Sequence, residues 1–378
     1  MRPLLGKALT IALLVLATMS PALAHKSSDS YLSVSIEGKT VNGQWDIALR
    51  DLDYAIGLDS NNDGIITWGE LRAHQPAIAD YALSHLRIAS DGEACEAHAS
   101  DHLIDNHSDG AYEVLRFSAA CRSPPKLLEI TYDLLFDFDP QHRGLLRLEE
   151  HGATHTAVFS PDQRNWRIRG EEVSWQRQVR DYLREGVWHI WTGYDHMLFL
   201  SALLLPAVLR RHARRWEAVA NFGEAFRDVL KIVTAFTLAH SVTLSMAVLG
   251  YIAVPSRLVE SAIALSVIAA ALNNLFPLVE KRLWAVAFAF GLVHGLGFAN
   301  VLAELGLPRD ALAVSLVSFN LGVEVGQLAV VGGLLPLAYL WRRSWTYPRL
   351  VLGAGSLCIV AIASLWLIER SLNVRFLS

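Results

Sequence analysis

Apolar and polar positions divide the chain into three stretches. Residues 1–24, and most of the chain after about residue 186, form long apolar runs, whereas residues 25–180 mix apolar and polar positions as soluble domains do. Within this middle stretch, residues 31–48 alternate around Glu37-Gly38, which predicts a β-hairpin. Similar runs that predict further strands lie at 112–121, 126–136, 143–150 and 154–160. We therefore expect a small, mostly β sandwich-type domain with one helical insertion.

Six apolar runs in the last stretch each approach the roughly 20 residues that a helix needs to cross a bilayer. These predicted spans cover approximately 187–208, 229–251, 258–279, 283–303, 313–340 and 350–368. Lysine and arginine concentrate in the loops at 210–215, 280–282 and 342–349, and the loops at 253–257 and 306–310 hold few. By the positive-inside rule the basic loops face the cytoplasm, so the N-terminal domain lies outside.

These patterns together predict the fold class and the domain organisation. The fold is an α-helical bundle of six transmembrane helices at 186–370, preceded by a small mostly-β exported domain at 25–180 and followed by a short tail at 371–378. The N-terminal run combines Arg2 and Lys7, a short apolar segment and Ala22-Leu23-Ala24. It predicts a signal peptide at 1–24 rather than a first transmembrane helix, because the run is short and ends in a cleavage pattern. We expect a bacterial inner-membrane protein whose exported domain lies in the periplasm.

Charge and cysteine content narrow the possible roles. The 378 residues are 52% hydrophobic and carry a formal net charge of -4 without a basic patch, so nucleic acid is not an expected partner. The apolar runs make a lipid bilayer an expected partner, and the intramembrane side chains described below add a metal ion. A homo-oligomer is left open. Cys95 and Cys121 both fall in the exported domain, where we predict a disulfide between them, and Cys358 is expected to be a free thiol.

A calcium-binding pattern occupies residues 59–70, DSNNDGIITWGE. It has the spacing of a twelve-residue EF-hand loop, with Gly64 at the sharp turn and flanking segments that can form the entering and exiting helices. We expect Ca²⁺ to stabilise the exported domain rather than to act as a signal, since there is one such loop. The predicted calcium ligands are Asp59, Asn61, Asp63, Ile65 (through its carbonyl), Thr67 and Glu70.

A second polar segment in the exported domain, EAHASDHLIDNHSD, contains His98, His102 and His107. Its residues could capture a transition metal, but their spacing enforces no site. We expect a solvated loop.

The predicted spans contain ionisable side chains that are costly in hydrocarbon. Each intramembrane charge costs on the order of 2.5–3.5 kcal/mol, so such groups normally face a polar interior path. Asn320, Glu324 and Gln327 are spaced to lie on one stripe of a helix, and glycines beside His294 allow neighbouring helices to approach closely. The predicted metal path consists of His189, Asp195, His196, His240, His294 and Glu324, with Asn273, Asn274, Asn320 and Gln327 as supporting polar residues.

Imidazoles combined with a few carboxylates suit borderline transition metals such as nickel, cobalt and zinc. Four functions remain open on these residues: a secondary transporter of such a metal, an intramembrane metal-dependent hydrolase, a bis-histidine haem carrier, and a calcium- or metal-responsive accessory protein that acts through its exported domain. No ATP-binding pattern G-x-x-x-x-G-K-[ST] is present, so primary transport would need another subunit.

Five segments of the membrane half resemble the HupE/UreJ family of hydrogenase and urease accessory membrane proteins: HIWTGYDHMLFL, TAFTLAHSVTLS, ALNNLFP, AFGLVHGLGFA and FNLGVEVGQL. The resemblance covers residues 186–368. It implies a nickel or cobalt secondary permease and assigns metal handling to His189, Gly193, Asp195 and His196. The chain departs from short family members in its large exported domain and in Ile-Trp-Thr at positions 190–192.

His189 and His196 are separated by seven positions, which places them about 10.5 Å apart in depth on a straight helix. They would not share an ion unless Gly193 breaks the helix. We therefore expect a two-step entry, with His189 receiving the metal and Asp195 and His196 passing it to a deeper site of His240, His294 and Glu324.

Overall fold

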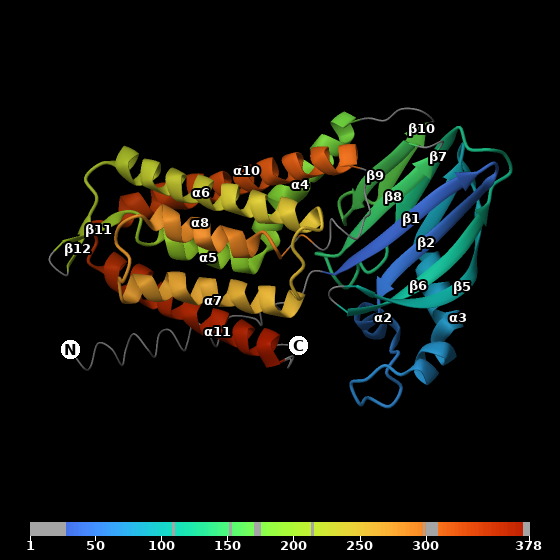
Figure 1. Ribbon diagram of the computed structural model, residues 1–378, viewed down its shortest axis with the longest axis horizontal. Helices are drawn as coiled ribbons and strands as arrows, with labels where there is room; N and C mark the ends of the chain where they lie inside the picture. The colour runs from blue at the N-terminus through green and yellow to red at the C-terminus, as the bar shows by residue number, and fades with distance from the viewer. Residues whose placement is uncertain are drawn as a thin grey trace. The chain divides into compact units, whose positions relative to one another are not determined.

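The structure is a computed structural model that describes residues 28–107, 110–150, 153–169, 175–212, 215–297, 299 and 309–372 (Figure 1). The predicted signal peptide and most of the predicted tail lie outside the described residues. The chain divides into two compact units. The β unit holds the described residues of 28–182 and 309–315, and the helical unit holds those of 183–299 and 316–372.

Ten strands of the β unit form two sheets (Figure 1). The six-stranded sheet has the order β5-β6-β2-β1-β8-β9 and the four-stranded sheet the order β10-β7-β3-β4. Neighbouring strands are antiparallel except β1 and β8, which are parallel. The strands are Asp29–Glu37 (β1), Thr40–Ala48 (β2), Leu86–Ser90 (β3), Glu93–Ala94 (β4), Glu96–His107 (β5), Gly110–Ala120 (β6), Leu127–Tyr132 (β7), Arg143–Glu150 (β8), Ala153–Phe159 (β9) and Asn165–Arg169 (β10).

The predicted hairpin is present as β1 and β2. Glu37 pairs with Thr40, and Gly38 adopts a φ of +63°, a left-handed conformation that glycine accommodates at this tight turn. Alternate side chains of both sheets enter one shared core, which includes Trp45 of β2 and Ile130 of β7. This alternation is what a sandwich requires, so the sandwich-type prediction agrees with the structure.

The helical insertion lies between β2 and β3. Helix α2 covers Leu49–Ile56 and α3 covers Trp68–Ser84, and the predicted calcium loop joins them. Leu52 and Leu71 are buried in the sandwich core, which fixes both helices to the sheets.

The segment containing His98, His102 and His107 is not a loop. It forms β5, an edge strand of the six-stranded sheet that pairs antiparallel with β6. The solvated-loop prediction is therefore wrong. The exposed edge position explains the error, because most β5 side chains remain in solvent and the strand needs few apolar residues.

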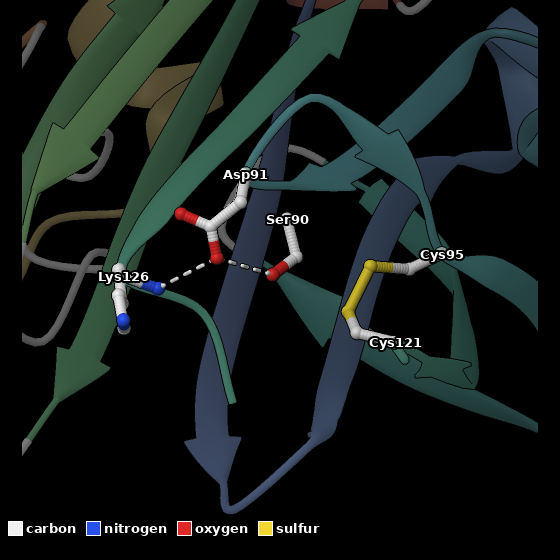
Figure 2. The surroundings of a disulfide bond; sticks show 5 residues. All are labelled: Ser90, Asp91, Cys95, Cys121 and Lys126. Carbon is white, nitrogen blue, oxygen red and sulfur yellow. Dashed lines mark hydrogen bonds between the residues drawn. A yellow bond between two sulfur atoms is a disulfide. The ribbon is translucent and has the colours of Figure 1, made fainter. Parts of the chain in front are cut away.

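Cys95 and Cys121 form the predicted disulfide (Figure 2). Cys95 directly precedes β5 and Cys121 directly follows β6, and the register places Glu96 opposite Ala120. Both cysteines are buried in the core. Cys358, in the helical unit, is free.

The helical unit contains four helices that are long and apolar enough to cross a membrane, counted over the described residues (Figure 1). They are Phe222–Val248 (α6), Ser256–Leu275 (α7), the Ala311–Trp341 portion of α10 (Arg309–Trp341), and Tyr347–Leu372, which comprises the π-helix η1 (Tyr347–Ala354) and α11 (Gly355–Leu372). Large apolar side chains such as Leu238, Val317 and Leu337 are exposed on their surfaces. A helix that is apolar on its outer face as well as inside is suited to lipid.

Two of the six predicted spans differ from the prediction. The first, 187–208, is interrupted at Gly193: α4 (Trp175–Thr192) ends before it and α5 (Tyr194–Leu204) begins after it. The fourth, 283–303, contains a shorter apolar helix, α8 (Leu283–His294), and runs into residues that the structure does not describe. The basic segment 210–215 also differs from a simple loop, since it contributes to the two-stranded sheet of β11 (Leu209–His212) and β12 (Arg215–Ala218).

Glycines permit two close helix contacts in this unit. A Cβ added at Gly322 of α10 would lie 2.1 Å from the Leu183 carbonyl oxygen of α4, and one added at Gly186 would lie 2.1 Å from the Phe319 carbonyl oxygen. A Cβ at Gly291 of α8 would lie 2.5 Å from the Phe236 carbonyl oxygen of α6. Small residues at such crossings let helix backbones approach directly.

Candidate metal site in the helical unit

Three histidines from three helices converge inside the helical unit. His189 lies on α4, His196 on α5 and His240 on α6, and each offers a ring nitrogen within 4.8 Å of the others. The ring centroids of His196 and His240 are 6.2 Å apart, and both side chains are buried. Converging imidazoles on rigid helices are a common way to build a transition-metal site.

The interruption at Gly193 brings His189 and His196 together. Gly193 has an extended backbone (φ −71°, ψ 95°), so α4 and α5 do not continue as one helix. The two ring centroids are 4.7 Å apart. The separation of about 10.5 Å, which assumed a straight helix, is therefore wrong, and so is the two-step arrangement built on it. The space around Gly193 is also too small for a side chain, since a Cβ there would lie 2.6 Å from the His189 carbonyl oxygen.

In His196 and His240, one ring nitrogen forms a hydrogen bond, and the other nitrogen is left with a lone pair that can bind a metal. The Asp195 carboxylate accepts from Nδ1 of His196 at 3.0 Å. Asn320 donates its Nδ2 to the Leu316 carbonyl, which leaves its Oδ1 to accept from Nδ1 of His240 at 3.3 Å. The Nε2 atoms of His196 and His240 are buried and have no hydrogen-bond partner among the described residues. Buried polar atoms are usually satisfied, so these two nitrogens are candidates for metal ligands.

His294 is placed beside this group by α8. Its ring centroid is 5.1 Å from that of His196. The Ser266 hydroxyl donates to the Ile263 carbonyl oxygen, so its oxygen accepts from Nε2 of His294 at 2.9 Å. This arrangement leaves Nδ1 of His294 as the lone-pair nitrogen, and that atom is also buried without a partner in the described part of the chain. Ser266 was not among the predicted residues, because a lone serine in an apolar span gives no signal in the sequence.

The six predicted path residues divide differently from the expectation. His189, His196, His240 and His294 form one cluster rather than an entry site and a deeper site, and Asp195 orients His196. Glu324 is bonded elsewhere, since its carboxylate accepts from the Thr234 hydroxyl at 3.1 Å. The cluster thus has nitrogen donors at its centre and oxygen atoms around it.

The four predicted supporting polar residues do not all lie beside the cluster. Asn320 contacts His240, and the Gln327 side-chain oxygen accepts from Thr237. Asn274 instead donates to the Ala202 carbonyl and the Ser356 hydroxyl, which ties α7 to α5 and α11. Asn273 accepts from the backbone of Leu278 and Val279 just after α7. The two asparagines of α7 therefore have structural partners.

The predicted calcium loop is a turn closed by its own polar side chains. The Asp59 carboxylate accepts from the Gly64 backbone N–H at 2.7 Å, and Gly64 has a φ of +81°. Thr67 caps α3, and Glu70 accepts from both the backbone and the hydroxyl of Thr67. The hydrogen bond from the Thr67 backbone, followed by that from its hydroxyl, lowers the pKa of Glu70. These hydrogen bonds favour the charged form of the Glu70 carboxylate.

A family model described as HupE / UreJ protein matches residues 163–370, which includes all four histidines of the cluster. The chain belongs to the HupE/UreJ family. This match confirms the resemblance of the five segments in the membrane half. Membership of the family identifies the chain as a membrane protein of nickel or cobalt transport or accessory function. No curated protein matches the chain.

Proposed function

We propose that this HupE/UreJ protein is a secondary transporter that carries a divalent transition metal, nickel or cobalt, inward across the bacterial inner membrane. One observation carries the proposal: imidazole nitrogens from α4, α5 and α6 lie within 4.8 Å of one another in an apolar helical unit. Zinc fits the same donors. Neutral imidazole binds these ions, whereas an oxygen-only path would suit calcium or magnesium.

The proposed path begins at the four-histidine cluster and uses Glu324 beyond it. The topology that serves this path has six spans, with α4 and α5 together as the first and α8 as the fourth. The β unit is then periplasmic, and the basic segments at 210–215, 280–282 and 342–349 are cytoplasmic. The asymmetric distribution of lysine and arginine supports this orientation.

Uptake of radioactive ⁶³Ni²⁺ or ⁵⁷Co²⁺ into proteoliposomes tests the function. We expect wild-type protein to accumulate the ion and His196→Ala and His240→Ala to lose most of the uptake, because each removes a nitrogen donor. His212→Ala is the matched control, since it removes an exposed imidazole from β11 in the same unit. If both cluster variants transport nickel and cobalt at the wild-type rate, the cluster is not the transport site.

We also propose that the loop from Asp59 to Glu70 binds Ca²⁺ and stabilises the β unit. The helix–loop–helix arrangement and the turn at Gly64 support this assignment. Calcium should slow proteolysis of the β unit in wild-type protein but not in Glu70→Gln. Equal protection of both proteins would count against the site.

A further inference from the structure

Helices α6 and α10 share a row of three polar contacts. His240, Thr237 and Thr234 of α6 are spaced by three residues, and each contacts one polar residue of α10. The ring of His240 meets Asn320 at 3.3 Å, Thr237 donates to Gln327 at 2.9 Å, and Thr234 donates to Glu324 at 3.1 Å. We call these six residues the α6–α10 seam.

The seam starts in the metal cluster and extends away from it along α6. His240 belongs to both, because its Nδ1 bonds to Asn320 in the seam, while its Nε2 is buried and has no hydrogen-bond partner among the described residues. Thr237 and Gln327 are buried, whereas Thr234 and Glu324 are half-buried and so reach a more open position. Polar side chains are expensive within an apolar bundle, and a continuous row of them between two helices normally borders a polar path.

Donor chemistry changes along this row. The cluster supplies imidazole nitrogens, and the seam supplies amide and hydroxyl oxygens and one carboxylate. Borderline divalent metals bind imidazole more strongly than neutral oxygen, so an ion that moves from the cluster along the seam meets progressively weaker partners until it reaches Glu324. Weak partners favour rapid transfer, and one carboxylate restores an attraction for a cation at the end of the row.

We propose that the α6–α10 seam is the route by which the metal leaves the histidine cluster, with Thr237 and Gln327 as oxygen contacts and Glu324 as the release ligand. This inference rests on the proposed transport function. It assigns Thr234 and Thr237 a role, and it separates the residues that hold the ion from those that release it. The competing role for these contacts is mechanical, since interhelical hydrogen bonds also hold transmembrane helices together.

Measurements of nickel binding and of nickel uptake with the full-length protein distinguish a role in metal release from a mechanical role. Nickel binding is measured by titration calorimetry in detergent, and uptake of ⁶³Ni²⁺ is measured in proteoliposomes. We expect Thr237→Val and Glu324→Gln to bind nickel with unchanged stoichiometry while uptake falls about tenfold, the effect of losing roughly one hydrogen-bond-sized interaction at a barrier. Thr237→Ser keeps the hydroxyl and should restore uptake.

Ser241→Ala is the matched control, because it removes a hydroxyl from α6 whose bond stays within the helix, to the Thr237 carbonyl. Wild-type uptake in both Thr237→Val and Glu324→Gln overturns the route. So does a parallel loss of binding and uptake, which identifies the contacts as structural. If wild-type protein itself neither binds nor transports the ion, the proposed function fails first and the route falls with it.

Discussion

The imidazoles of His189 and His196 lie 4.7 Å apart at their ring centroids although seven positions separate them in the chain. On an uninterrupted helix these positions would differ in depth by about 10.5 Å. The extended backbone of Gly193 ends α4 and lets α5 restart, so the straight-helix geometry does not apply and the two rings lie close together. The candidate metal site therefore depends on a break in the first apolar segment rather than on one face of a helix.

Substitution of Gly193 by alanine should weaken metal binding. The backbone angles of this residue suit alanine, but its Cβ would lie 2.6 Å from the His189 carbonyl oxygen and 3.1 Å from Nδ1 of His196. We expect the relief of these contacts to shift at least one of the two imidazoles. We expect about tenfold weaker nickel binding in titration calorimetry, together with a destabilisation of about 1–3 kcal/mol that is typical of overpacking.

Gly223→Ala provides the control for this change. Gly223 lies in the first turn of α6, and a Cβ there would meet nothing within 4 Å. Its nickel affinity should match that of wild type. Wild-type affinity in Gly193→Ala as well would show that the break tolerates a side chain without moving either ring.

Removal of the Ser266 hydroxyl should weaken metal binding without removing a ligand. This hydroxyl fixes which nitrogen of His294 carries the hydrogen, and so presents Nδ1 to the cluster. Loss of an orienting partner typically costs 10–100-fold in metal affinity, and we expect about tenfold for Ser266→Ala. Calorimetry with nickel measures the effect, and Ser266→Thr, which retains a hydroxyl, should bind more tightly than the alanine variant. Equal affinity of wild type and Ser266→Ala would remove His294 from the ligand set.

Much of the fold could be predicted because its patterns are local. Alternation around Gly38 indicates the β1–β2 hairpin, and apolar length indicates α6, α7 and α10. The edge strand β5 could not be recognised in the same way. An edge strand shields little apolar surface, so its composition resembles that of a loop and only its pairing with β6 defines it.

The candidate site could be predicted in its residue types but not in its arrangement. Histidines within apolar runs are conspicuous, which is why His240 and His294 were among the expected residues. Their grouping depends on which helices become neighbours and on the break at Gly193, and both result from long-range packing. The contact between Glu324 and Thr234 likewise joins residues 90 positions apart, so spacing along the chain cannot indicate it.

Stability of the β unit should fall as the pH is lowered below about 6. Burial, followed by the nearby charge of Arg143, lowers the pKa of His142 from 6.5 to about 3. Between these values the unfolded state binds a proton that the folded state does not, so stability is fully present above pH 6.5 and decreases as the pH falls towards 3. This single group contributes a slope of about 1.4 kcal/mol per pH unit in that window.

Urea unfolding of the β unit at several pH values measures this slope. His142→Gln removes the titrating group and retains atoms that can bond to Ser28 and Tyr132, the two partners of the ring. Its stability should depend less steeply on pH, although His155, whose pKa is also lowered by burial, leaves part of the slope. The same slope in wild type and variant would show that His142 does not control the acid sensitivity.

Loss of the Cys95–Cys121 disulfide should destabilise the β unit and leave the metal site unaffected. The bond links two cysteines 26 positions apart, one just before β5 and the other just after β6, and therefore restricts the unfolded chain. A closed loop of this length corresponds to about 3.5 kcal/mol of stabilisation. We expect the Cys95→Ala, Cys121→Ala double variant to be cleaved by trypsin at lower urea concentrations than wild type while its nickel affinity is unchanged.

Cys358→Ala, which removes the free thiol, should behave as wild type in both assays. Because the two units carry separate sites, reduced nickel binding in the double variant would indicate that the β unit supports the histidine cluster.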